Sequence, residues 1–81
     1  SDRAVEVLSA ADKKNLQRAV QKAEKRISEL ENELGKYEQK MADPEFYNKP
    51  DSNEAIKKYN NLKIELATVY NEWETAVEKL A

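Results

Sequence analysis

The segment Leu16–Met41, LQRAVQKAEKRISELENELGKYEQKM, carries the pattern that decides the fold. Its apolar residues recur at alternating intervals of four and three positions, and they are Leu16, Val20, Ala23, Ile27, Leu30, Leu34, Tyr37 and Met41. An average spacing of about 3.5 residues is that of a coiled-coil seam, in which one stripe of a helix packs against a partner helix. The segment therefore predicts a long helix, from about residue 10 to about residue 42, whose apolar stripe must be covered by another helix.

A second segment repeats the same spacing after a short interruption. Its apolar positions are Ala55, Tyr59, Leu62, Leu66, Val69, Trp73, Ala76 and Leu80. Pro44 and Pro50 lie between the two segments, and proline disfavours the helical conformation in the residue before it. We therefore predict an all-α fold, an antiparallel two-helix coiled-coil hairpin with a short helical turn at the tip. The tip takes residues 43–52 and the second helix about 53–81.

Pairing Met41 with Ala55 sets the register of this hairpin. Ala23 then lies opposite Trp73, so a small seam residue meets the largest one, and we expect Trp73 in the core. The same register lays the basic block 12–26 beside the acidic block 64–81 and predicts an ion pair between Arg26 and Glu72. The first residues have no partner in the second helix. We therefore expect a linker and helix overhang at 1–14 and the hairpin at 15–81.

The composition excludes several classes of function. The 81 residues contain no cysteine and no histidine, which removes disulfides, thiol nucleophiles, imidazole bases and the usual zinc ligands. Carboxylate pairs on water-exposed helices have nothing to shift their pKa values, so we expect no enzyme activity. No apolar run approaches the ~20 residues that span a membrane. We expect a domain without catalytic, metal or cofactor sites, without membrane contact, and in a cytoplasmic setting.

Two groups of cations are candidates for contact with nucleic acid. The first, which we call the basic ridge, follows the back of the first helix at spacings of four, four and three residues, and consists of Lys14, Arg18, Lys22 and Lys25. Such a ridge would track phosphates through salt-dependent contacts that do not depend on sequence. The alternative is the ordinary solvated face of a coiled coil. The second, weaker group is at the tip, which Lys36, Lys40, Lys49, Lys57 and Lys58 surround. Of these, the candidate contacts are Lys49, Lys57 and Lys58, which we call the tip lysines.

Apolar residues outside the two seams have two interpretations each. Phe46 and Tyr47 at the tip would stack on a base or fill a partner's pocket, or else cap the open end of the core. The second helix also has a wider apolar stripe than one partner needs, through Ile56, Ile64, Tyr70 and Val77. These residues would form a docking face for other domains of a longer protein or for a second hairpin, or they would seal the edge of the seam.

Two stretches resemble the C-terminal coiled-coil domain of ABC-F ATPases of the Uup type. They are the turn MADPEFY at Met41–Tyr47 and the segment VYNEWE at Val69–Glu74. The resemblance covers roughly residues 8–81, and the turn and the Glu-Trp-Glu segment carry it, because heptads are common to all coiled coils. The chain departs from the family in its first helix, which has no proline around Glu24, and in Asp12, which stands where the family has glutamate.

The resemblance implies an accessory domain of a cytosolic protein with two ATP-binding cassettes. It implies contact with DNA or ribosomal RNA, contact with the cassettes of the same chain, and modulation of the ATPase. ATP and magnesium would belong to that longer protein, so no cofactor is expected in this domain, which we expect to be monomeric. The alternative is a structural or oligomerising coiled coil with a protein partner and no role with nucleic acid.

Overall fold

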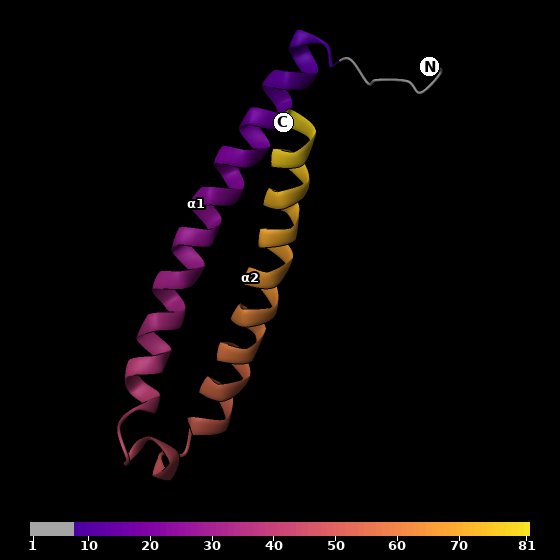
Figure 1. The fold of residues 1–81 in the computed structure, drawn as a ribbon. Coiled ribbons are helices and arrows are strands. Elements are labelled where there is room, and N and C mark those ends of the chain that lie inside the picture. Colours follow the sequence, from indigo (N-terminus) through magenta and orange to yellow (C-terminus); the bar gives the residue numbers. More distant parts are fainter. Residues whose placement is uncertain (1–7) are drawn as a thin grey trace.

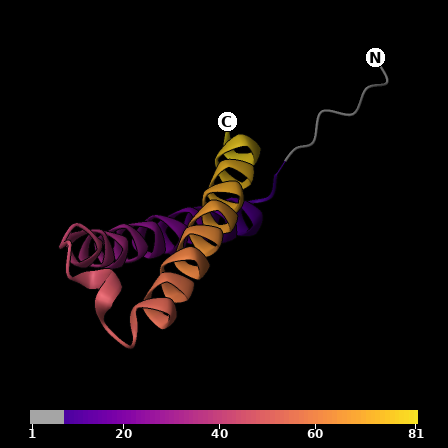
Figure 2. The same ribbon diagram turned by 90° about the horizontal axis from the view of Figure 1, so that it is seen from below.

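The computed structural model describes residues 8–81 as two long helices that run antiparallel and are joined by a short turn (Figure 1). Helix α1 spans Ala10–Met41, the 3-10 turn η1 spans Phe46–Asn48 and helix α2 spans Ser52–Leu80. The two helices lie side by side and are inclined to each other when viewed from below (Figure 2). The predicted all-α hairpin is thus confirmed. The part of the predicted linker at residues 1–7 lies outside the described residues.

Local hydrogen bonds fix where α1 begins and how the chain turns at the tip. The Asp12 amide donates to Ser9 Oγ at 3.0 Å, so Ser9 caps the first turn as its residue type predicts. At the tip, Asp43 accepts from two amides: Glu45 N reaches its side-chain Oδ1 at 3.0 Å and Phe46 N reaches its carbonyl at 2.9 Å. Asp51 precedes α2, but its side chain makes no capping hydrogen bond.

The core is a thin seam between the two helices, centred on Leu30. Leu30 is 0% exposed and packs in a cluster with Ala23 and Ile27 of α1 and Val69 of α2. Leu62, Leu66 and Trp73 pack against this cluster as partly buried residues. Trp73 therefore joins the side of the seam that contains Ala23, as the register predicts, but it is half-buried rather than enclosed. Two helices cannot enclose a side chain as large as an indole, because no further helix covers the edges of the seam between them.

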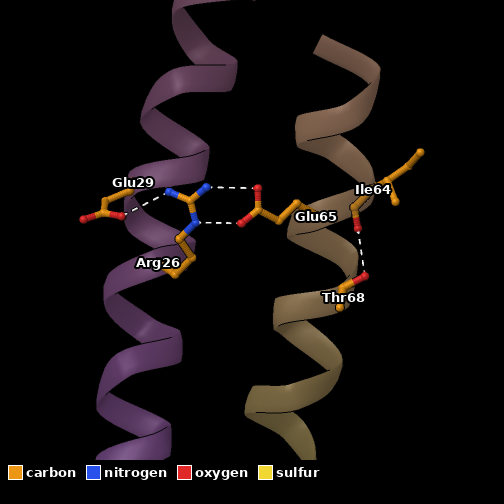
Figure 3. A network of polar contacts seen from close by, with 5 residues as sticks. All are labelled: Arg26, Glu29, Ile64, Glu65 and Thr68. Carbon is orange, nitrogen blue, oxygen red and sulfur yellow. Dashed lines mark hydrogen bonds and ion pairs between the residues drawn. The ribbon is translucent and has the colours of Figure 1, made fainter. Parts of the chain in front are cut away.

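An ion pair on one side of the seam differs from the predicted one. Arg26 donates two hydrogen bonds to Glu65, from Nε to Oε2 at 2.8 Å and from Nη2 to Oε1 at 2.9 Å, and does not pair with Glu72 (Figure 3). Its Nη1 also donates to Glu29 Oε1 at 3.2 Å. Glu29 lies about one turn after Arg26 on α1, and its hydrogen bond draws the guanidinium toward the carboxyl-terminal end of α1. In the antiparallel hairpin, Glu65 of α2 lies beside that part of α1. The double hydrogen bond from Arg26 lowers the pKa of the Glu65 carboxyl.

Truncation of the central leucine tests the seam. Because Leu30 is fully buried, Leu30→Ala is expected to lower the free energy of unfolding by about 2–5 kcal/mol, through lost burial and the cavity left behind. Urea unfolding followed by circular dichroism measures the change. Ile64→Ala, at an exposed position of α2, is the control and is expected to change stability by less than about 0.5 kcal/mol. Equal effects of the two variants would contradict the packing.

Gly35 offers a stabilising substitution. It lies inside α1, and a Cβ built on it meets no atom within 4 Å. Gly35→Ala is therefore expected to raise the free energy of unfolding by roughly 1 kcal/mol, because alanine has the higher helix propensity. The urea midpoint of the variant should be higher than that of the wild type. A lower midpoint would mean that the space around Gly35 is filled in solution.

The Arg26–Glu65 pair predicts a pH-dependent contribution to stability. The folded chain holds the Glu65 pKa below its ordinary value of about 4.3, so the pair stabilises fully above that pH and its contribution falls as pH drops through the lowered pKa. The difference in urea midpoint between wild type and Glu65→Gln should be positive at pH 7 and shrink toward zero at strongly acidic pH. Glu72→Gln, which removes a carboxylate outside the pair, should show no such collapse. A pH-independent Glu65→Gln difference would contradict the pair.

Candidate functional site

The four cations of the basic ridge are all exposed on α1. None of them takes part in an ion pair among residues 8–81, whereas Arg26, next to Lys25 in sequence, is committed to Glu29 and Glu65. Their spacing places them away from the seam, because the core residues of α1 occupy the opposite stripe of the helix. The ridge therefore presents cations whose charge no contact in the described chain neutralises directly.

A groove beside the Arg26–Glu65 pair adjoins only one half of the basic ridge. The groove has a volume of about 660 Å³, and its lining includes Lys22 and Lys25 of the ridge together with the carboxylates Glu29, Glu65 and Glu72. Nearby opposite charges lower the local positive potential even without direct contact. Lys14 and Arg18 do not line this groove. Lys22 and Lys25 thus share a groove with carboxylates, whereas Lys14 and Arg18 lie outside it.

The tip lysines form a separate surface. Lys49, Lys57 and Lys58 are exposed, and Lys49 ends the η1 turn, where its amide donates to the Phe46 carbonyl at 3.1 Å. Lys25 and Met41 are sixteen positions apart on α1, which corresponds to about 24 Å along the helix axis at 1.5 Å per residue. The fold therefore does not bring the ridge and the tip lysines together into one site.

The two tip aromatics divide between the two roles predicted for them. Phe46 is 4% exposed and closes the end of the core, whereas Tyr47 is 59% exposed. Their rings meet edge to face, with centroids 5.0 Å apart. Packing against Phe46 orients the Tyr47 ring without covering it. Only Tyr47 is accessible to a base or a partner.

One side of the hairpin carries a regular set of contacts that the sequence analysis missed. Three glutamates of α1, each seven residues from the next, accept hydrogen bonds from aromatic residues of α2 through Oε2. The pairs are Glu24 with Trp73 Nε1 at 3.0 Å, Glu31 with Tyr70 Oη at 2.8 Å, and Glu38 with Tyr59 Oη at 3.0 Å. We call this side the glutamate flank. The hydrogen bonds to the carboxylates raise the pKa values of Tyr59 and Tyr70.

The heptad spacing of these glutamates was the available sequence signal. Glu24, Glu31 and Glu38 occupy equivalent heptad positions next to the seam. Their aromatic partners on α2 do not recur every seven residues, so the spacing marks the glutamates but not their contacts. A phenol or an indole that donates to a carboxylate carries no charge, and such pairs are invisible to a comparison of charges.

Metal-binding and membrane-spanning features are absent from the described residues. Residues 8–81 contain no group of three or more acidic side chains arranged to hold a metal ion. In the same residues, neither helix combines the length and the apolar character needed to cross a bilayer.

Comparison with known proteins gives one finding. No curated protein and no solved structure matches the chain. The family model described as ABC transporter C-terminal domain matches residues 13–76, which is most of the chain and includes the tip and most of both helices. The resemblance based on the turn and the Glu-Trp-Glu segment is therefore confirmed at the level of the family. The chain belongs to the ABC transporter C-terminal domain family.

Proposed function

We propose that this domain is a non-catalytic accessory module of an ABC-F-type ATP-binding protein, and that its basic ridge contacts the phosphate backbone of DNA or ribosomal RNA. Family membership supports the accessory role. The observation that carries the nucleic-acid role is the set of four exposed ridge cations, none in an ion pair among residues 8–81. The ATPase would be modulated if nucleic acid bound to this domain changed the domain's contacts with the ATP-binding cassettes of the same chain.

The chemistry of the ridge favours backbone contact over base recognition. No aromatic residue interrupts the segment from Lys14 to Lys25, so it offers no ring on which a base could stack. Its lysines and single arginine are donors that suit phosphate oxygens, and phosphate contacts carry no sequence information. Exposed Tyr47, beside the tip lysines, would add one stacking contact at the far end of the arm. We therefore propose weak binding that does not depend on sequence and falls steeply with salt.

A second function, a coiled coil that binds a protein, is favoured by a different observation. Ile64 is 66% exposed and Tyr70 is 42% exposed, and both lie on α2 away from the basic ridge. Large exposed apolar residues at neighbouring positions mark protein contacts more often than nucleic-acid contacts. The two functions use different surfaces of the hairpin and are separable by substitution.

Neutralising the ridge is expected to abolish the salt-dependent part of nucleic-acid binding. Each phosphate contact adds about −0.9 to the slope of log K against log salt for duplex DNA, so four contacts give roughly −3.6 and about a hundredfold loss of affinity between 50 and 200 mM salt. A variant with glutamine at all four ridge positions should bring that slope close to zero. Fluorescence anisotropy with a labelled 20-base-pair duplex, and with an RNA hairpin of similar size, measures it.

A matched control removes the same amount of charge elsewhere. It carries glutamine at four lysines outside the ridge and outside the tip set, namely Lys13, Lys36, Lys63 and Lys79. This control should retain most of the wild-type slope. If it lost as much affinity as the ridge variant, net charge and not the ridge would govern binding. If wild-type affinity were equal at both salt concentrations, the proposal would be wrong.

A further inference from the structure

The three carboxylates of the glutamate flank keep their negative charge, because their hydrogen-bond donors are neutral. The donors to Glu24, Glu31 and Glu38 are an indole and two phenols, which are neutral, so each carboxylate is fixed in position but keeps its negative charge. On the other side of the seam, Glu29 and Glu65 are both ion-paired with the guanidinium of Arg26. No ion pair among residues 8–81 involves the three flank glutamates. The two sides of one seam therefore differ in charge.

The geometry of the three carboxylates is that of one row. Their spacing of seven residues corresponds to about 10.5 Å along α1, and the row spans about 21 Å. Each carboxylate uses Oε2 for the aromatic donor, which leaves Oε1 for a further donor from outside. A helix laid along this side would meet one carboxylate every two turns. On α2, Lys63 lies over the ring of Tyr59, the donor to Glu38, with its Nζ 5.4 Å from the ring centroid.

An apolar patch adjoins the row. Tyr70, which donates to Glu31, is separated by three residues from Ala67, and Ala67 by three from Ile64, so the three side chains are neighbours on the surface of α2. Ile64 points away from α1 in Figure 3, while its neighbour Glu65 points toward Arg26. Ile64 therefore contributes nothing to the seam. The apolar patch of Ile64, Ala67 and Tyr70 therefore continues the glutamate flank onto α2, and no part of the described hairpin covers it.

We propose that the glutamate flank, with the patch formed by Ile64, Ala67 and Tyr70, docks an amphipathic helix of a partner protein that carries lysine or arginine beside an apolar stripe. Apolar side chains of that helix cover Ile64 and Tyr70, and its cations meet the row of carboxylates. The charge argues against a second copy of this chain on the same surface, because two such flanks would place one acidic row against the other. The basic ridge of a second copy offers cations but no large exposed apolar residue.

Two synthetic peptides test the charge requirement directly. Both have 21 residues with leucine at the seam positions of three heptads, and they differ in having lysine or glutamate at the positions that flank the leucines. Titration of each into the isotopically labelled 81-residue chain is followed by amide chemical shifts. The lysine peptide should bind at least about tenfold more tightly, and its shifts should centre on Glu31, Ile64 and Tyr70.

Three double variants locate the contact, and the first two of them remove the same amount of charge. Glu31→Gln with Glu38→Gln removes two carboxylates from the row and should weaken the lysine peptide by roughly 3- to 10-fold, as expected for two exposed charge pairs. Glu33→Gln with Glu72→Gln removes two carboxylates outside the row and should leave the affinity within about twofold. Ile64→Ala with Tyr70→Ala should weaken binding about tenfold or more. Circular dichroism confirms that each variant is folded.

Several outcomes would overturn the proposal. They are equal binding of the two peptides, no binding of the lysine peptide at millimolar concentration, equal loss in the two glutamine variants, or shifts confined to the basic ridge or the tip. Sedimentation equilibrium provides the remaining test: self-association that Ile64→Ala abolishes would make a second copy the occupant. The four-glutamine ridge variant should bind the lysine peptide as the wild type does, so failure of the nucleic-acid proposal leaves this one intact.

Discussion

The packing of α1 against α2 along one apolar seam is the interaction on which the rest of the structure depends. Each helix alone would expose a stripe of leucine, isoleucine and valine to water, and the chain has no third element to cover it within the described residues. The tip fits this requirement: Asp43 starts the turn, Phe46 closes the end of the core, and α2 returns along α1. Leu30 at the centre of the seam is the most completely buried side chain.

The seam also determines where function can reside. Because the apolar side chains are used between the helices, contacts with other molecules must be made by the outer faces. Those faces are chemically distinct: a row of cations on the back of α1, a side on which Arg26 is ion-paired with Glu65, and a side with three carboxylates beside Ile64 and Tyr70. The two functions proposed for this domain use surfaces of opposite charge, the basic ridge for phosphates and the glutamate flank for a basic helix.

The fold was largely predictable because heptad spacing and proline positions act locally. Seam residues, helix limits and the tip follow from counting intervals and from Pro44 and Pro50. Contacts at the edges of the seam were not predictable in the same way. Arg26 could reach Glu65 or Glu72, and Glu29 on its own helix favours Glu65. The flank contacts depend on the directions of long aromatic and glutamate side chains, which residue spacing alone does not specify.

Nuclear Overhauser effects from the Trp73 indole provide the most direct test of the antiparallel hairpin. In a sample that mixes isotopically labelled and unlabelled chains, a hairpin predicts strong contacts from the indole to the methyl groups of Ala23 and Ile27 within one chain. Contacts seen only between labelled and unlabelled chains would show that the helices pair across two molecules. An indole with no contact to any residue of α1 would contradict the seam itself.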